Sequence, residues 1–418
     1  MTAAPIETPP SAPPPARPPR GRAAVALLGV SLVLVSFNLR PIFPSLSAVL
    51  PDATRDLQLS AAFTSLITTL PVLCLGLFAP FAPGLARRFG AERTVMLAMT
   101  LLAVGTALRG HGSAAGLMVG SLAAGASIAI GNVLLPSLVK RDFPASAALM
   151  TGLYTMALCG GAALAAGVTV PLEQAAGGSW RFALAVWALP ALLVAGLWIV
   201  QQPRNAPAPA VRVAGAGPRR RLWRGLAHDR LAWQVTLFMG LQSALAYIVF
   251  GWLAPMLRDR GLSAVDAGLV VSVCVLAQTV SCLAAPGLAV RGRDQRLIAV
   301  TIVACAVFGL FGCFYAPLWT VWGWAVLQGI GQGSLIAVAM TIIVLRSPDN
   351  LVAAELSSMA QSVGYCLAAA GPLLAGLLNG WTGSFTGTAV LVGLLGLGAS
   401  AAALGAGRAR LVKADPPG

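Results

Sequence analysis

Twelve long apolar stretches divide this chain, and they constrain its fold more than any other feature of the sequence. Eleven of them have 20 residues or more, which is the length a helix needs to cross the roughly 30 Å of hydrocarbon in a bilayer. Only 10% of the 418 residues are charged, whereas a soluble domain carries about 25%. The sequence therefore predicts an all-α polytopic membrane protein with twelve transmembrane helices.

Six apolar stretches precede a hydrophilic break and six follow it. We expect spans at 23–50, 61–86, 94–109, 114–139, 146–172, 180–200, 231–257, 264–290, 297–316, 318–345, 352–380 and 385–407. The resulting segments are a disordered Pro-rich tail (1–22), a six-helix bundle (23–200), a basic linker (201–230), a second six-helix bundle (231–407) and a short tail (408–418).

The formal net charge of +15 could indicate nucleic-acid binding, but the basic residues lie in short gaps between the apolar stretches. Of the 28 Lys and Arg residues, 22 fall on one side of the predicted membrane, five on the other, and Arg40 lies inside the first span. By the positive-inside rule, both termini and the linker are cytoplasmic. We therefore expect contact with the lipid bilayer and no nucleic-acid partner.

The two bundles repeat one another. At an offset of 203, Leu50, Arg55, Asp56, Leu59, Ser60 and Ala61 align with Leu253, Arg258, Asp259, Leu262, Ser263 and Ala264, and APGLA at 82–86 recurs at 285–289. A shared RD dipeptide and pentapeptide in one ungapped frame indicate duplication. Because each copy has an even number of spans, the copies are parallel repeats, an arrangement whose substrate site lies between them near the midplane.

Arg40 lies about 24 Å into the first span at 1.5 Å per residue, where a charge costs at least ~2.5 kcal/mol. Pro41 and Pro44 each remove a backbone donor, which predicts a kinked or interrupted helix. Arg40 could offer its guanidinium fork to a small anion or polar substrate. It could equally be a structural arginine that binds the freed carbonyls, and both interpretations stay open at this stage.

Other polar side chains inside the spans come in pairs four residues apart, so that each pair shares a helix face. The pairs are Ser243 with Tyr247, Gln328 with Gln332, and Gln361 with Tyr365, and further candidates are Asn38, Asn132, Tyr154, Gln242 and Gln278. Together they predict a polar central cavity that binds substrate. For each one alone, a hydrogen bond between helices is an equally good interpretation.

Few residues of the spans suit catalysis, metal binding or proton transfer. No Asp, Glu or His lies deep in a span, Glu355 and Glu173 being near span ends, so the usual carboxylate of a proton relay is not visible. The seven cysteines lie in apolar segments without a CxxC pair, and the two histidines are far apart. We therefore expect no metal, no cofactor and no enzymatic activity.

At these residues the chain resembles the cyanate and 2-nitroimidazole transporters (CynX/NimT) of the major facilitator superfamily. The resemblance rests on NLRP at 38–41, LPVLCLGLFAP at 70–80, LARRFG at 85–90, GLYT at 152–155, WQVTLFMGLQS at 233–243 and GWLAPMLRDRGLS at 251–263. It implies a monomeric secondary carrier of a small anionic or polar solute, cyanate-like or nitroimidazole-like, working by alternating access in the bacterial inner membrane. The alternative is an exporter of hydrophobic or aromatic compounds.

The resemblance also implies a gating loop between the second and third spans, which here contains Arg87, Arg88, Gly90 and Arg93. The superfamily pattern G-x-L-A-D-R-x-G-R-R has an Asp where this chain has Arg87, so the usual Asp-based contact is not expected. The fifth span also lacks the Gly-Pro pair of many drug exporters, which disfavours broad multidrug export.

Overall fold

The computed structural model describes residues 22–201, 225–292 and 294–413, and every regular element in these ranges is helical. Twelve helical segments are long and apolar enough to cross a membrane. The predicted twelve-helix fold is therefore confirmed. The predicted Pro-rich tail, most of the basic linker and the last five residues lie outside the described residues.

The first half contributes six spans, three of which consist of two helices. Its helices are α1 (Arg22–Asn38), α2 (Ile42–Asp56), α3 (Ala61–Phe78), α4 (Ala82–Phe89), α5 (Ala91–Arg109), α6 (Ala114–Asp142), α7 (Ala147–Ala175), α8 (Trp180–Ala185) and α9 (Ala188–Gln201). The first span is α1 with α2, the second is α3 with α4, and the sixth is α8 with α9.

The second half contributes the other six spans, and only one of them is divided. Its helices are α11 (Arg230–Asp259), α12 (Ala264–Ala289), α13 (Arg296–Tyr315), α14 (Val321–Leu345), α15 (Asn350–Ala368), α16 (Ala370–Thr382) and α17 (Thr386–Ala406). The divided span is α15 with α16, which together form the eleventh crossing.

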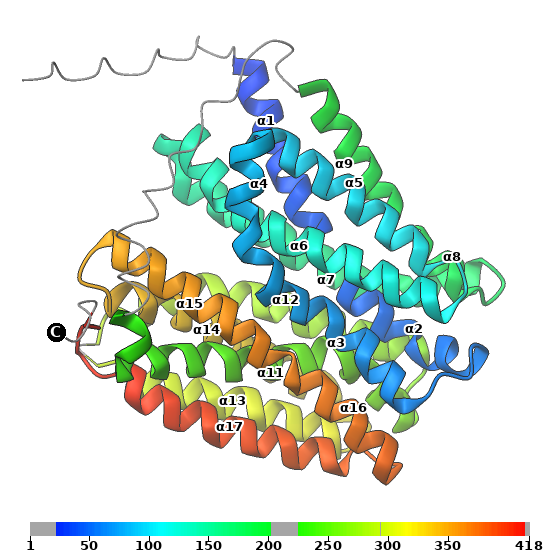
Figure 1. Cartoon of the computed structure of the whole chain (residues 1–418). Coiled ribbons are helices and arrows are strands. Elements are labelled where there is room, and N and C mark those ends of the chain that lie inside the picture. The colour runs from blue at the N-terminus through cyan, green and yellow to red at the C-terminus, as the bar shows by residue number, and fades with distance from the viewer. Residues whose placement is uncertain (1–21, 202–224, 293, 414–418) are drawn as a thin grey trace, which may run out of the picture.

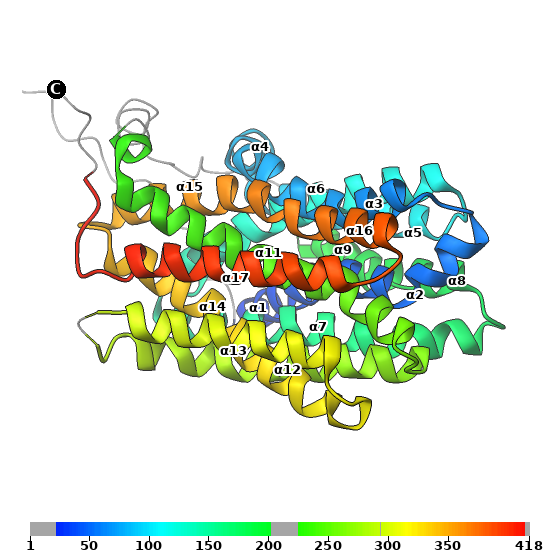
Figure 2. The same ribbon diagram turned by 90° about the horizontal axis from the view of Figure 1, so that it is seen from below.

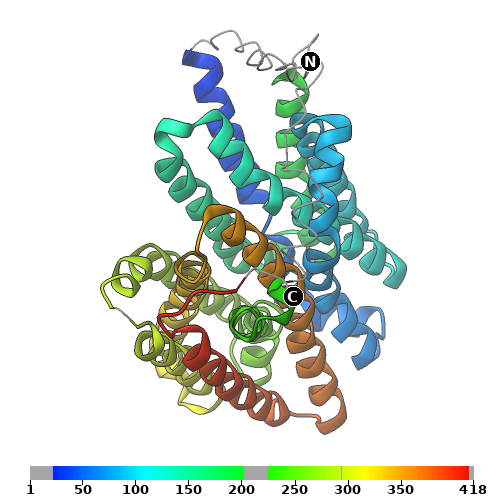
Figure 3. The same cartoon turned by 60° about the vertical axis from the view of Figure 1, so that its left-hand side comes forward.

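The halves form two bundles that are tilted relative to one another (Figures 1, 2 and 3). The first half contacts the second where α2 packs on α11, α3 on α15 and α16, and α7 on α12. In contrast, α1 packs on α6, α7 and α9, and α4 on α5 and α6, all within the first half. The bundles therefore meet at the end where α2 finishes, which we call the closed end. They diverge toward the opposite end, where α4 finishes and α15 begins (Figure 1). We call it the arginine-rich end, because Arg87 and Arg88 of α4 and Arg141 of α6 lie there.

The repeat seen in the sequence is visible in the backbone. Ser60 and Ser263 occupy equivalent positions, and each caps the next helix by accepting a hydrogen bond from the backbone N–H three residues later. Two residues earlier, Gln58 and Gly261 both have positive φ angles, of 50° and 100°. That conformation favours glycine, so the turn has kept its backbone shape in the first half although the side chain differs.

The first span is interrupted at Arg40, as the prolines predict, because α1 ends at Asn38 and α2 begins at Ile42. Pro41 cannot donate to the carbonyl of Phe37 four residues earlier. That carbonyl packs instead against Gly161 of α7, too closely for any larger residue. The equivalent of Pro41 in the second half is Ala244, and there α11 runs without interruption from Arg230 to Asp259.

The second span shows the same contrast between the halves. A short 3-10 turn (Ala79–Phe81) containing Pro80 separates α3 from α4. The repeat equivalent of Pro80 is Leu283, and α12 is continuous around it although Pro286 lies in its last turn. Proline placement therefore makes the first two spans of the first half segmented and their counterparts continuous.

Candidate functional site

Arg40 lies at the junction of the two bundles, in the interruption between α1 and α2. The residue as a whole is half-buried, and desolvation acts on its guanidinium. The polar groups that act on it electrostatically are Cys159 of α7 in the first half, and Tyr247 of α11, Cys282 of α12 and Tyr365 of α15 in the second. Among the described residues no carboxylate pairs with Arg40, so its charge is available to a ligand that enters between the halves.

The rings of Tyr247, Phe250 and Tyr365 lie near this guanidinium, and Phe43 packs on two of them; we call these four residues the aromatic cluster. The Arg40 Cζ lies 5.7 Å from the centroid of the Phe250 ring, within cation–π range. The Tyr247 ring lies 5.3 Å from Phe43 and 6.2 Å from both Phe250 and Tyr365, the last in an edge-on arrangement of 72°. The site therefore combines one unpaired cation with flat apolar walls.

The structure brings together only some of the residues that the sequence singles out. Arg40, Tyr247 and Tyr365 meet at the junction. Gln242, Gln328 and Gln332 are about 1% exposed and connect helices to one another. Gln332 Nε2 donates to Gln242 Oε1 at 3.2 Å, and Gln328 Oε1 accepts from Cys274 Sγ at 2.7 Å. For these three amides the helix-to-helix interpretation is the one that the geometry supports.

The remaining candidates are engaged locally or lie away from Arg40. Ser243 accepts from Gln242 Nε2 at 2.9 Å, while Asn38 Nδ2 donates to the carbonyl of Leu34 and Gln361 Nε2 to Ser357 Oγ, both at 2.8 Å within their own helices. Asn132, Tyr154 and Gln278 are half-buried. In the described part of the chain no interaction connects these last three with Arg40, and their role as substrate contacts stays a prediction.

Sequence reasoning missed four residues of this site: Phe43, Phe250, Cys159 and Cys282. The spacing contained a signal for Phe250, because it follows Tyr247 by three residues and so shares its helix face. Phe43 likewise follows Arg40 by three residues. The two cysteines lie in apolar segments without a CxxC pair, and nothing in the sequence alone shows that they approach the same arginine from opposite halves.

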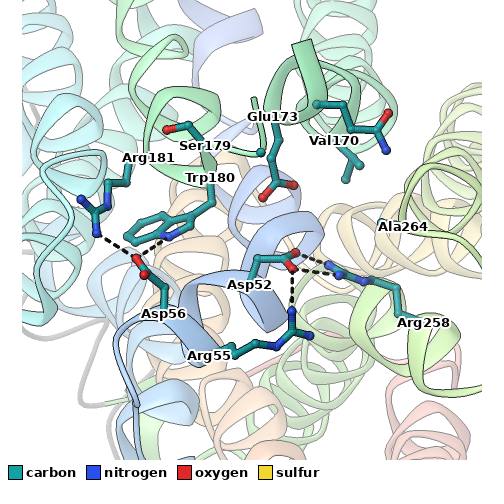
Figure 4. Close-up of a pocket in the computed structure, with 12 residues that line it drawn as sticks. Asp52, Arg55, Asp56, Val170, Glu173, Ser179, Trp180, Arg181, Arg258 and Ala264 are labelled. Atoms are coloured by element: carbon teal, nitrogen blue, oxygen red, sulfur yellow. Dashed lines mark hydrogen bonds and ion pairs between the residues drawn. The ribbon is translucent and has the colours of Figure 1, made fainter. Parts of the chain in front are cut away.

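A second group of charges lies in a cavity of about 650 Å³ at the closed end (Figure 4). Arg258 of α11 makes two contacts to Asp52 of α2, at 2.6 and 3.2 Å, and so joins the halves. Asp56 accepts from Trp180 Nε1 at 3.0 Å and from Arg181 Nη2 at 2.8 Å. Bidentate guanidinium–carboxylate pairs are among the strongest ion pairs in proteins, so the Asp52–Arg258 pair favours contact between the halves here.

The predicted gating loop lies at the arginine-rich end. Arg87, Arg88 and Arg93 are exposed, and Gly90, with a φ of 85°, separates α4 from α5. The ion pair beside this loop uses Glu92, which lies 2.7 Å from Arg141 Nη2 at the end of α6. The loop is therefore fixed by a carboxylate two residues past the glycine, and both partners belong to the first half.

The corresponding corner of the second half uses backbone oxygens instead of a carboxylate. Arg346, which follows α14, donates to the carbonyls of Ala406 and Gly407 at 3.0 Å each and also to the side-chain oxygen of Gln295. Burial lowers the pKa of the Arg346 guanidinium from its ordinary value. This contact ties the ends of α14 and α17 to the start of α13.

Comparison with known proteins agrees with this fold and with the site between two bundles. Residues 25–312 match the sequence profile of the Major Facilitator Superfamily. More than half of the chain lies within the match, and the chain therefore belongs to this superfamily of membrane transporters.

Its relatives place it more narrowly. The chain is 36% identical over 398 residues to the 2-nitroimidazole transporter of Escherichia coli (strain K12), covering 94% of this chain and 98% of the relative. It is 27% identical over 355 residues to the cyanate transport protein CynX of the same organism, covering 85% and 90%. The chain is thus a superfamily transporter of the CynX/NimT type, as its sequence motifs indicate.

Solved structures support the fold. A D-xylose-proton symporter superposes with a TM-score of 0.74 at 14% identity, over 93% of this chain and 98% of that one. At that identity the likeness concerns the arrangement of helices only. Together with the twelve apolar spans and the bacterial relatives, it identifies a multi-pass protein of the bacterial inner membrane.

Proposed function

We propose that this transporter is a secondary carrier of a small anionic or polar solute, cyanate-like or nitroimidazole-like, which binds at Arg40 between the two bundles. The observation that carries the proposal is a desolvated guanidinium inside a span without a carboxylate partner among the described residues. A charge within the span is costly unless something compensates it. A small anion or a nitro group would accept two hydrogen bonds from the fork while the aromatic cluster contacts its flat face.

The same proposal includes an orientation and a mechanism. The arginine-rich end faces the cytoplasm, as the positive-inside rule suggests, and both termini lie there. The conformation described here then exposes the site to the cytoplasm, because the bundles diverge at that end and the Asp52–Arg258 pair joins them at the other. Alternating access follows when this pair separates and the arginine-rich ends approach each other. The working unit is a monomer.

The aromatic cluster favours one alternative, an exporter of hydrophobic or aromatic compounds. Each of the four rings has its centroid within 6.4 Å of the centroid of another ring in the cluster. Together they could bind a neutral aromatic compound without a contribution from the arginine. The two functions differ in what they require of Arg40, and they can be separated by changing that residue alone.

The test is counterflow into proteoliposomes with labelled 2-nitroimidazole, cyanate and small carboxylates. Arg40→Lys keeps the charge but loses the planar fork, so we expect exchange to fall at least about tenfold. Arg55→Lys is the matched control because Arg55 lies in the same span and its side chain is 77% exposed. Unchanged exchange by Arg40→Lys would contradict the bidentate role. Unchanged exchange of 2-nitroimidazole by Arg40→Gln would favour the alternative.

A further inference from the structure

The cavity at the closed end contains a buried glutamate that the proposed substrate site does not use. Glu173 lies near the end of α7 and is only 7% exposed. Its carboxylate points into the cavity, toward Asp52 and Arg258 (Figure 4). Across the described ranges the Glu173 side chain makes no hydrogen bond and no ion pair, and the charged groups that act on it are Asp52 and Arg258.

The other charged groups around the cavity are already engaged or point to solvent. The elements packed on α7 near this end are α2, α8 and α12, and α11 contributes Arg258. From α8 comes Arg181, which pairs with Asp56 of α2, while Arg55 of α2 is largely exposed. The contribution of α12 to the cavity is the uncharged Ala264. Glu173 is therefore influenced by one carboxylate and one guanidinium.

The signs of these two interactions are opposed. An ionised Glu173 repels Asp52 and attracts Arg258. Because Arg258 already makes two contacts to Asp52 and donates to the carbonyl of Ala48 at 3.1 Å, an ionised Glu173 competes for a guanidinium that joins the halves at this point. A proton on Glu173 removes the repulsion and the competition together. Proton binding at Glu173 therefore favours the conformation in which the two halves stay in contact at the closed end.

We propose that Glu173 is a proton-binding site that links proton uptake to closure of this end of the transporter, and so couples transport to a proton gradient. A proton suits the site better than a metal ion, which needs several oxygen ligands, since Asp52 and Asp56 are both held by arginines. Glu355, the other buried glutamate of a span, lies at the opposite end and has interaction partners of its own. The link to closure stands alone, whereas the coupling to transport rests on the proposed function.

A conformational measurement tests the link without any substrate. His111, in the turn after α5, and Thr382, the last residue of α16, are exposed and lie at the closed end in different halves. Fluorophores attached through unnatural amino acids at these positions leave the native cysteines in place. Between pH 8 and pH 6 we expect the ratio of closed to open molecules of the wild type to rise at least about fivefold. Glu173→Gln should keep the closed-to-open ratio of the protonated wild type at both pH values, changing less than about twofold.

Two further variants make this outcome specific. Gln174→Ala changes a neutral neighbour that lines the same cavity and should keep the wild-type response. Glu173→Asp keeps a titratable group and should also respond to pH, which covers the case in which Glu173→Gln does not fold. A wild type that shows no shift, or a Glu173→Gln protein that shifts like the wild type, would overturn the proposal.

A transport measurement tests the coupling. With labelled 2-nitroimidazole, Glu173→Gln should exchange label by counterflow at a rate within about twofold of the wild type. It should lose at least about tenfold of the uphill accumulation driven by a pH gradient. Uphill accumulation by Glu173→Gln at the wild-type level would refute the coupling. Absence of counterflow in the wild type would instead count against the proposed function and leave the fluorescence result standing.

Discussion

The first span of each half occupies the same place in the repeat, yet the two differ in shape and in charge. In the first half α1 and α2 are separated at Arg40, and the carbonyl freed by Pro41 packs on Gly161. In the second half α11 is unbroken, and the equivalent of Arg40 is Ser243, which is almost fully buried. The duplicated frame has thus become specialised: the first half supplies a charge at a break, and the second supplies a continuous helix with aromatic side chains.

The strongest test of this asymmetry exchanges the two equivalent residues. Arg40→Ser combined with Ser243→Arg should lower counterflow of 2-nitroimidazole about 1000-fold, because two charge-assisted hydrogen bonds of about 2 kcal/mol each are lost. Ser243 is 3% exposed and already bonded to Gln242, so an arginine there must displace buried neighbours and cannot repeat the setting of Arg40 at a break in the helix. Size-exclusion profiles establish that the variant is folded. A rate near that of the wild type would show that the two positions are equivalent.

The break itself can be tested by exchanging proline and alanine. Ala244→Pro should destabilise the protein by about 3 kcal/mol, since a proline removes a bond from the interior of α11 where Gly371 packs on Ala244. Pro41→Ala should leave the melting temperature unchanged while lowering counterflow, because a restored helical bond would draw the Phe37 carbonyl away from Gly161. Thermal melting in detergent, read beside counterflow, separates the two effects. An Ala244→Pro protein that melts like the wild type would disprove the difference in continuity.

The closed end offers a comparison between repeat-equivalent arginines. Arg258 is bidentate to Asp52 across the halves, whereas Arg55 approaches the same carboxylate only at 3.8 Å and is mostly exposed. The repeat places Pro255 in the second half at the position equivalent to Asp52. The two equivalent arginines therefore share the single carboxylate of Asp52, and Arg258 makes the closer contacts to it. Arg258→Gln should lower the closed population about tenfold, and Arg55→Gln less than about twofold, as expected for a partly buried and an exposed pair. The fluorophore pair at 111 and 382 measures both, and equal effects would contradict the assignment.

Two arginine contacts at the arginine-rich end, of Arg346 in the second half and of Arg141 in the first, should differ in their contribution to stability and in their response to salt. Removing Arg346 leaves two carbonyls and an amide without their donor, and Arg346→Gln should cost about 2 kcal/mol. Arg141→Gln breaks a partly exposed ion pair with Glu92 and should cost under about 1 kcal/mol. Melting curves at low and high salt provide the check, since salt screens only the second effect. Equal salt dependence would be evidence against this distinction.

The smallest expected effect concerns Arg109, whose repeat equivalent is Gly312. Arg109 is 1% exposed, and its three side-chain nitrogens have no hydrogen-bond partner among the described residues. A buried charge without a partner is unfavourable, and an apolar side chain of similar length avoids that cost. Arg109→Met should therefore raise the melting temperature slightly, equivalent to about 1 kcal/mol. A lower melting temperature would mean that Arg109 stabilises the fold.

Much of the fold could be predicted because membrane solvation acts on local sequence. The length of each apolar stretch determines a span, and Pro41 and Pro44 predict the interruption without any tertiary information. The repeat is also a property of the sequence, and it reappears as equivalent caps at Ser60 and Ser263. None of these inferences requires knowing which helices are neighbours.

The site was less predictable for the same reason. A shared helix face indicates which residues act together but does not indicate what that face meets. The Gln328 and Gln332 face meets other helices, whereas the Tyr247 face meets Arg40. Glu173 and Arg109 lie near span ends, where a charge is ordinary, and their burial follows from packing between helices that are distant in sequence.

The interruption at Arg40 also divides the first span into two segments that pack against different helices. The α1 segment packs on helices of its own bundle among its principal contacts, while α2 packs both on α7 of its own bundle and on α11 and α12 of the other. When the bundles rotate against each other, α2 can follow the interface and α1 can follow its bundle, with the change in direction absorbed at residues 39–41. Arg40 lies in this break, so its guanidinium stands where the two segments of the span can change direction relative to each other.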